Sequence, residues 1–267
     1  MIVHRTRGTR HGAITRLMSP GDLGQVLKPF VFLDLFDMGI ASFPGIGLHP
    51  HSGIATVTYL FEGSVRYEDT TGATGVLREG GVEWFKAGHG AWHGGGPGDA
   101  DRSRGFQLWL ALPPDAELGP VENVYQAPDT VARDGPARVL LGTHGAAVSS
   151  ISPPASINYL AVRLRAGQLW RYKPAIDHTI CWVALGTGRL LVPERVEGGE
   201  LAIFEPSNGA IAFSADADAE FVVGSAAPHA DDLVLGRYSV HTSKATLQAG
   251  ERRLGEIQQR LKNEGRL

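Results

Sequence analysis

Two parts of the chain that lie far apart in the sequence carry the same succession of strand-like segments and turn glycines. The matched segments are residues 56–63 and 179–186, 81–85 and 199–204, and 88–93 and 208–212. Any two half-buried β segments can look alike by chance, but here the order of the segments and the glycines that punctuate them are both preserved. The pattern therefore predicts a duplication, with two similar barrels or sandwiches in tandem.

The composition favours an all-β fold with one terminal helix. The 35 glycines and 16 prolines are spread through 267 residues that contain many short runs of Val, Ile, Tyr, Phe and Trp, which indicates short strands joined by frequent turns. Only residues 244–264 carry a helical pattern, with Thr242 or Ser243 as the N-cap. The apolar positions of this helix are Leu247, Leu254, Ile257 and Leu261. We expect this amphipathic helix to pack on the β body.

The duplication divides the chain into two predicted domains. Residues 1–135 form the N-terminal domain, and residues 136–267 form the C-terminal domain, which includes the helix. The predicted connection runs from about residue 113 to residue 154, because this stretch is rich in Pro, Asp and Gly. It is also long enough to hold strands of its own.

Charge and cysteine content exclude several classes of protein. A net charge of −3 gives no basis for electrostatic capture of nucleic acid or of an anionic membrane. Cys181 is the single cysteine, so no intramolecular disulfide can form. The start of the chain lacks the apolar stretch of a signal peptide, and no later run is long enough to span a bilayer. We therefore expect a cytoplasmic protein, and a monomer in which two fused barrels satisfy each other's packing.

Three histidines distinguish the first copy of the duplicated pattern from the second. His49 and His51 lead into the strand that begins near residue 56, and residues two apart in a strand point to the same face. His93 ends a later segment that the duplication places beside that strand. The corresponding positions of the second copy hold Tyr172, Pro174 and Ala212. His89, in a Gly-His-Gly turn, is a rival or accessory ligand for which exposure to solvent is the plainer expectation.

Neutral imidazoles bind iron, nickel, copper and zinc, and three of them leave coordination positions open for water or substrate. The sequence therefore predicts a transition-metal site at His49, His51 and His93 in the N-terminal domain.

The motifs around these histidines resemble those of the pirin family within the cupin superfamily. The matching segments are residues 32–36, 49–53, 56–60, 62–63, 68–72, 81–84, 87–93, 106–110 and 232–242. The resemblance is specific in the N-terminal half and mainly architectural in the C-terminal half. It implies two cupin barrels, a metal, usually iron, in the N-terminal barrel, and in some members flavonol dioxygenase (quercetinase) activity. Other members are linked to transcriptional or stress regulation through partner proteins.

The resemblance also implies a ligand set of three histidines and one glutamate, from which this chain departs. The histidines match His49, His51 and His93, but Gly95 stands at the position of the glutamate. A second glutamate of the family pattern is replaced by Ala55. We therefore expect a site without a carboxylate, in which a divalent ion keeps its full charge and binds more weakly.

Loss of a carboxylate that acts as general base would cost about 10²–10⁴-fold in rate. Asp99 or Asp101, in the loop after the glycines, is our hypothesis for a substitute ligand.

Three functions are compatible with these residues. The first is a quercetinase-type dioxygenase acting on a small aromatic substrate, with Fe(II) as the expected metal and Ni, Zn, Mn or Cu as alternatives. Its expected apolar wall is Phe43, Leu48, Tyr59, Phe61, Trp84, Trp92 and Trp109. The second is a non-catalytic binding or regulatory protein with a weakened metal site or none, and with a protein partner that the sequence does not identify. The third is an enzyme of another cupin chemistry.

Overall fold

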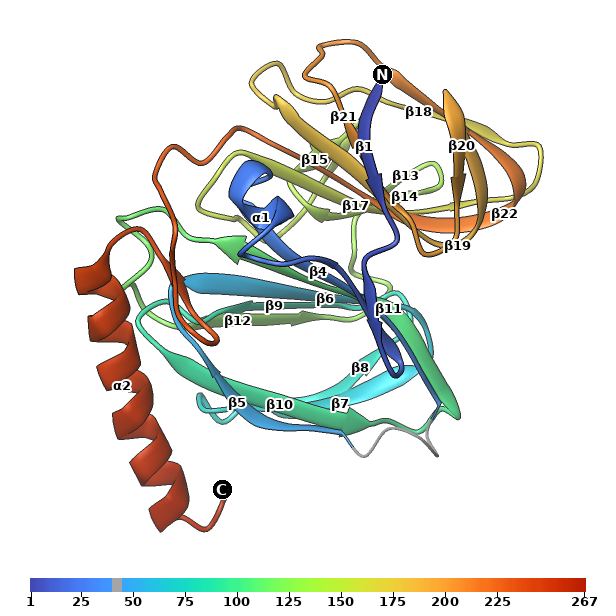
Figure 1. Cartoon of the computed structure of the whole chain (residues 1–267). Helices are drawn as coiled ribbons and strands as arrows, with labels where there is room; N and C mark the ends of the chain where they lie inside the picture. The colour runs from blue at the N-terminus through green and yellow to red at the C-terminus, as the bar shows by residue number, and fades with distance from the viewer. Residues whose placement is uncertain (40–44) are drawn as a thin grey trace. The chain divides into compact units, whose positions relative to one another are not determined.

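The two halves of the chain are not the two units of the structure. The computed structural model describes residues 1–39 and 45–267 and divides into two units of β-sheet (Figure 1). One unit comprises Met1–Leu17 and Thr130–Pro228, and the other comprises Met18–Asp129 and His229–Leu267. The predicted division at residue 135 therefore lies close to one real boundary but assigns both ends of the chain to the wrong unit.

Strand pairing and apolar packing explain this exchange of the chain ends. Strand β1 (Ile2–Thr6) pairs antiparallel with β21 (Leu201–Phe204) and forms the edge of that sheet. At the other end of the chain, helix α2 (Lys244–Asn263) buries Leu254, Ile257 and Leu261 against Trp92. The sequence pattern predicts the helix, but for neither segment does it indicate which sheet the segment joins.

The unit that contains residues 130–228 is built on a 9-stranded antiparallel sheet. Its order is β1-β21-β19-β22-β17-β14-β13, with β18 paired to β22 and β20 paired to β19. The bounds are β13 (Arg133–Asp134), β14 (Ala137–Leu141), β17 (Ile157–Leu164), β18 (Leu169–Tyr172), β19 (Ile180–Val192), β20 (Glu194–Glu197) and β22 (Ile211–Ala226). The short hairpin of β15 (Thr143–His144) with β16 (Ala147–Val148) completes the unit. Strands β2 (Thr9–His11) and β3 (Ile14–Met18) pair with each other and belong to a 7-stranded sheet.

Large apolar side chains fill the core of the unit that this sheet forms. Trp170 lies 5.4 Å from Phe213 and 6.1 Å from Phe221 between ring centroids, and Tyr172 stacks on Trp170 at 5.9 Å. Strand β18 pairs with the start of β22 as the histidine strands pair in the other unit. Of the three positions that match the histidines of the first copy, Tyr172 belongs to this aromatic core, and Pro174 and Ala212 offer no metal ligand.

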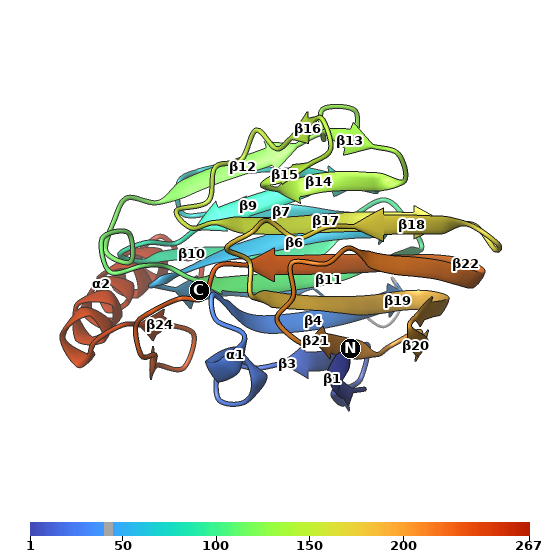
Figure 2. The same ribbon diagram turned by 90° about the horizontal axis from the view of Figure 1, so that it is seen from above.

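The other unit is a sandwich of two antiparallel sheets that face each other (Figure 1). The 7-stranded sheet has the order β12-β9-β6-β11-β4-β3-β2, and the 4-stranded sheet has the order β5-β10-β7-β8. The bounds are β4 (Phe30–Gly39), β5 (Ile46–His51), β6 (Ile54–Glu62), β7 (Ser64–Asp69), β8 (Thr74–Arg78), β9 (Val82–Lys86), β10 (Ala91–Pro97), β11 (Arg102–Ala111) and β12 (Glu122–Gln126). A short helix α1 (Leu23–Val26), the hairpin β23 (Val234–Leu235) with β24 (Val240–His241) and α2 complete the unit. The strands of the larger sheet run side by side in Figure 2.

Cross-strand register aligns two rows of side chains on one face of the larger sheet. One row is polar and crosses the sheet as Tyr125, Glu83, Thr58, Gln107 and Asp34. The next row is mostly aromatic and crosses it as Asn123, Phe85, Thr56, Trp109 and Phe32. Paired residues of neighbouring strands share a face, and this face is the one turned towards the histidines.

Helix α2 covers the outer face of β5 and β10. Side chains alternate along a strand, so Leu48 and Trp92 point away from the interior that their neighbouring histidines face, and both contact the apolar stripe of α2. The side chain of Ser243 caps the helix by accepting a hydrogen bond from the backbone N–H of Thr246 at 3.2 Å. The predicted terminal helix and its packing are confirmed, with Ser243 as the cap. Among the described residues, no helix combines the length and apolar character needed to cross a membrane.

Candidate metal centre

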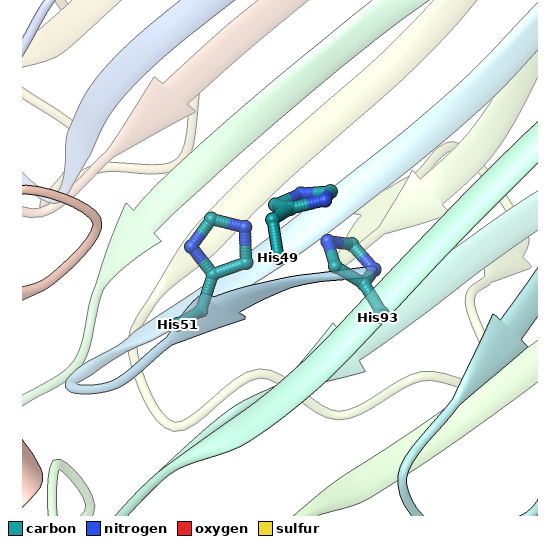
Figure 3. A group of neighbouring side chains, drawn as sticks. All are labelled: His49, His51 and His93. Atoms are coloured by element: carbon teal, nitrogen blue, oxygen red, sulfur yellow. The ribbon is translucent and has the colours of Figure 1, made fainter. Parts of the chain in front are cut away.

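The three predicted histidines meet inside the sandwich unit. Antiparallel pairing of β5 with β10 sets His93 opposite His49 and Ala91 opposite His51. Each histidine offers a ring nitrogen, and these three atoms lie within 4.8 Å of one another. Figure 3 shows the three imidazoles turned towards one another from the two strands. In the part of the chain that the structure describes, this is the one group of His, Cys, Asp or Glu side chains with the spacing of a metal site.

Hydrogen-bond acceptors occupy the Nδ1 side of all three rings. The acceptor for His49 is the Gly47 carbonyl at 3.0 Å, and that for His51 is the Tyr238 carbonyl at 2.9 Å. For His93 it is Oε1 of Glu83 at 3.3 Å. A carbonyl oxygen cannot donate, so Nδ1 carries the proton and Nε2 presents its lone pair to the centre. Nε2 of His51 is buried without a hydrogen-bond partner among the described residues, which is expected of an atom that binds a metal. The residues present therefore fit a divalent transition metal.

Burial keeps two of these imidazoles neutral. Desolvation, followed by the proximity of His93, lowers the pKa of His49 to about 4. Desolvation and the other two histidines hold the pKa of His51 well below its usual value. A neutral imidazole is the form that binds a metal, so the site is ready for a metal ion at neutral pH.

The lowered pKa of His49 predicts that the metal-free protein loses stability in mild acid. The unfolded chain binds a proton at His49 near pH 6.5, but the folded chain does so only near pH 4. Between these values the unfolded state holds more protons, so stability falls as pH falls, by at most about 1.4 kcal/mol per pH unit. Denaturant unfolding of metal-free protein at pH 7 and pH 5 should show this loss. The loss should be smaller in His49→Asn, and an equal loss in both proteins would contradict the prediction.

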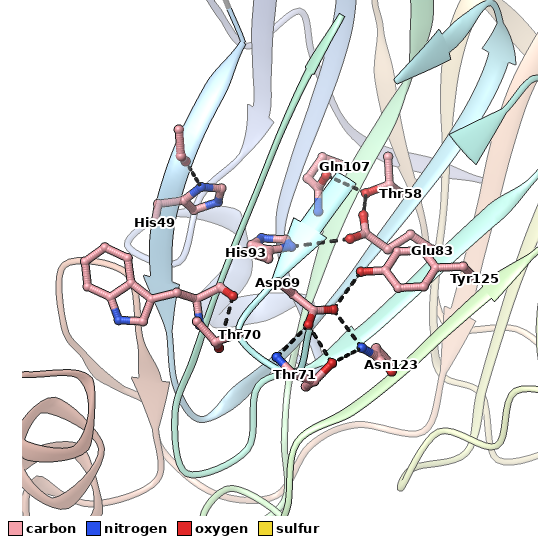
Figure 4. A network of polar contacts seen from close by, with 12 residues as sticks. His49, Thr58, Asp69, Thr70, Thr71, Glu83, His93, Gln107, Asn123 and Tyr125 are labelled. Atoms are coloured by element: carbon pink, nitrogen blue, oxygen red, sulfur yellow. Dashed lines mark hydrogen bonds and ion pairs between the residues drawn. The ribbon is translucent and has the colours of Figure 1, made fainter. Parts of the chain in front are cut away.

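A carboxylate does belong to the site, contrary to the expectation from the sequence. Glu83 on β9 is 7% exposed and places its two oxygens on His93 and on the hydroxyl of Thr58 (Figure 4). Burial raises the pKa of Glu83, but the hydrogen bonds from His93 and Thr58, together with the electrostatic effect of His93 and His49, outweigh this effect and lower it overall. The sequence contained one signal, an acidic residue within the apolar segment 82–86.

The family pattern has glutamates at the positions of Gly95 and Ala55, and only Gly95 lies beside the histidines in the structure. A Cβ atom at Gly95 would lie 2.2 Å from the backbone oxygen of Arg66, so the backbone of β10 leaves no room for a side chain there. Ala55 lies on the opposite face of β6 from Thr56, which faces the histidines. The prediction that Ala55 removes a carboxylate from the site is therefore wrong.

The proposed substitute carboxylates lie elsewhere. Asp99 is exposed, accepts a hydrogen bond from Ser64 at 2.5 Å and pairs with Arg78 at 3.0 Å. These contacts, with the Ser64 hydroxyl as the largest cause, lower the pKa of Asp99. Asp101 is exposed, and neither residue belongs to the group around the histidines. The hypothesis that one of them completes the site is not supported by the geometry.

The aromatic wall is only partly the predicted one. Trp109 meets the ring of His51 edge-on at 4.7 Å, as predicted for a wall residue. Tyr59, Phe61 and Trp84 belong to the opposite face of the sheet, and Leu48 and Trp92 contact α2. Phe43 lies outside the described residues. The residues that sequence reasoning missed are Phe85, stacked on His93 at 4.5 Å, and Phe32, stacked on Trp109 at 4.0 Å.

Hydrogen bonds hold a further buried carboxylate beside the polar row. Asp69, opposite His93 on β7, accepts from Tyr125, from Asn123 and from the backbone and hydroxyl of Thr71 (Figure 4). With all these donors satisfied, Asp69 anchors the turn after β7. Desolvation and then the charge of Glu83 raise the pKa of Tyr125, so its phenol stays protonated.

A buried cluster ties the C-terminal segment to the strand that follows His51. The imidazole of His241 lies between Ser52 Oγ, 3.0 Å from Nε2, and Glu117 Oε2, 3.3 Å from Nδ1. A serine, histidine and glutamate in this order can form a nucleophilic triad. Here their exposed fractions are 0%, 1% and 0%, so a substrate cannot reach the hydroxyl. The cluster instead fixes the segment that supplies the Tyr238 carbonyl to His51.

Comparison with known proteins identifies the family. A family model described as Pirin matches residues 11–110. Over 249 residues the chain is 30% identical to a pirin-like protein of Caulobacter vibrioides, which covers 88% of this chain and 89% of that protein. The chain belongs to the pirin family. Another pirin relative, from Pseudomonas aeruginosa, bears the name "Putative quercetin 2,3-dioxygenase" and is 30% identical over 84% of this chain and 83% of its own.

Solved structures confirm the fold of two cupin barrels. A quercetin 2,3-dioxygenase from Acinetobacter baumannii superposes with a TM-score of 0.87 at 23% identity over 96% of both chains. The Escherichia coli pirin YhhW in complex with nickel(II) gives a TM-score of 0.66 at 18% identity, over 82% of this chain and 94% of that one. At these identities the similarity establishes architecture, and the activity has to be argued from the site.

Proposed function

We propose that this pirin is a metal-dependent dioxygenase that uses O2 to cleave a flavonol-like substrate, with Fe(II) held by His49, His51 and His93. The observation that carries the proposal is the convergence of three imidazole rings. In each ring a hydrogen-bond acceptor contacts Nδ1, which leaves Nε2 free to bind a metal. A divalent transition metal with open coordination positions supplies Lewis-acid and one-electron redox chemistry towards O2. The name of the Pseudomonas relative supports the same substrate class.

The chain's own residues suit a flat phenolic substrate. Phe85, Trp109 and Phe32 offer an aromatic row next to the histidines, which excludes water and can contact a planar ring. The hydroxyl of Thr56 lies within that row, buried and without a hydrogen-bond partner among the described residues. It is placed to hydrogen-bond a substrate hydroxyl and so to orient the ring. His49 is the least buried of the three histidines and marks the side from which substrate enters.

The test is aerobic turnover of a flavonol by protein loaded anaerobically with Fe(II). We expect loss of flavonol absorbance with uptake of one O2 per substrate, at a rate at least about 10²-fold above that of metal-free protein. No O2-dependent loss in protein with stoichiometric iron would reject the dioxygenase and favour a binding protein. Parallel samples loaded with nickel, zinc, manganese or copper identify the metal that supports the reaction.

A further inference from the structure

The most unusual group near the metal site is the buried side chain of Glu83. Its carboxylate is almost inaccessible to solvent, and a buried carboxylate requires a compensating charge or several hydrogen-bond donors. Among the described residues its Oε1 accepts the Nδ1 proton of His93 at 3.3 Å, and it pairs with no lysine or arginine. The hydroxyl of Thr58 fixes the other carboxylate oxygen. The negative charge of Glu83 is thus directed at the ring of His93.

Glu83 carries a negative charge without a cationic partner in the described part of the chain, and a divalent ion at the three histidines would carry a positive charge that no anionic ligand neutralises. Three neutral imidazoles leave the full charge of a divalent ion uncompensated. Figure 4 shows His93 between His49 on one side and Glu83 on the other, so the ring connects the carboxylate to the centre. A carboxylate that accepts the Nδ1 proton of a ligating histidine makes that ligand more basic and fixes its orientation. One carboxylate neutralises half the charge of the ion.

The strand geometry explains why the charge comes from β9. At Gly95 the backbone of Arg66 occupies the space of a side chain, and at Gly94 a Cβ atom would lie 2.9 Å from backbone atoms of Gly47 and Leu48. The segment after His93 is therefore packed too closely to its neighbours to carry a carboxylate. Glu83 reaches the same ligand from the facing sheet.

From these observations, and resting on the proposed metal centre, we propose that Glu83 is a positioning residue that supplies, through Nδ1 of His93, the negative charge that this site lacks among its direct ligands. It does not contact substrate. It sets how tightly the metal is held and how easily the metal is oxidised.

The decisive variant is Glu83→Gln, which preserves the volume and an acceptor oxygen but removes the charge. We expect the dissociation constants for Ni²⁺ and for anaerobic Fe²⁺, measured by competition with a chelator, to rise about 10- to 100-fold. The Fe(III)/Fe(II) reduction potential should shift upwards, because loss of a negative charge favours the ferrous state. A purely structural role would move neither quantity in a folded variant.

The matched control is Glu62→Gln. Glu62 ends the neighbouring strand β6, is 40% exposed at its side chain and pairs with Arg104 at 3.5 Å, away from the histidines. We expect its metal affinity and potential to equal those of the wild type. If Glu83→Gln binds both metals as tightly as the wild type, the role of Glu83 is rejected while the metal centre stands. If the wild type binds no metal, both proposals fail.

The wild-type protein provides a second measurement in case Glu83→Gln does not fold. In protein loaded with Zn²⁺, a proton shared between Nδ1 of His93 and a carboxylate should resonate further downfield than the Nδ1 protons of His49 and His51, whose acceptors are backbone carbonyls. Three equivalent resonances would overturn the proposal.

Discussion

Replacing His51 with alanine is expected to eliminate stoichiometric metal binding. His51 is fully buried, its Nδ1 is fixed by the Tyr238 carbonyl and its ring is held against Trp109, so its Nε2 is held in place towards the other two histidines. Loss of a direct ligand should cost more than the roughly 10- to 100-fold in affinity that loss of an outer hydrogen-bond partner costs. Elemental analysis of untagged protein after reconstitution with Fe²⁺ measures the effect.

His89→Ala is the matched control for this variant. His89 lies in the same chain segment as His93 but is exposed and does not belong to the metal group. Its variant should bind as much iron as the wild type. Equal iron in His51→Ala, or loss of iron in His89→Ala, would place the metal elsewhere.

The convergence of the three histidines was predictable because it depends on local geometry. Residues two apart in a strand share a face, which is enough to bring His49 and His51 together. The match between the two copies then brought His93 into the same region, although its strand β10 pairs with β5, which carries His49 and His51, and not with the strand that begins near residue 56. Both inferences need only the period of a strand and the order of the segments.

The surroundings of the ligands were less predictable because β6 and β9 are buried on both faces. From Ile54 to Phe61 every residue of β6 is buried, so alternation of apolar and polar residues does not show which face holds the site. That ambiguity put Tyr59 and Trp84 in the predicted wall and left Phe85 out of it. It also concealed Glu83, whose role depends on which face of β9 is turned towards the other sheet. Which face of a strand packs against the other sheet depends on tertiary structure, and a strand that is buried on both faces carries no periodic pattern that reveals it.

The largest expected effect on stability comes from Glu117→Ala. Glu117 is fully buried and accepts hydrogen bonds from the backbone N–H of Thr242 at 2.7 Å and from its hydroxyl at 2.9 Å, next to His241. Alanine would leave these donors without a partner in the interior. Leaving a buried donor unpaired costs about 1–3 kcal/mol, and this variant leaves two of them. Hydrogen exchange of amides in β5, β10 and α2 should report the loss for this unit.

Glu256→Ala is the control on the same C-terminal segment. Its side chain is 66% exposed and pairs with Arg253 on the helix surface, an interaction expected to contribute less than about 1 kcal/mol. Because the segment fixed by Glu117 also supplies the Tyr238 carbonyl to His51, Glu117→Ala should lower metal affinity as well, and Glu256→Ala should not. Glu117→Ala with wild-type metal affinity but reduced stability would show that the segment holds the fold without orienting His51. Retention of both properties would mean that neither the fold nor the metal centre depends on the buried cluster.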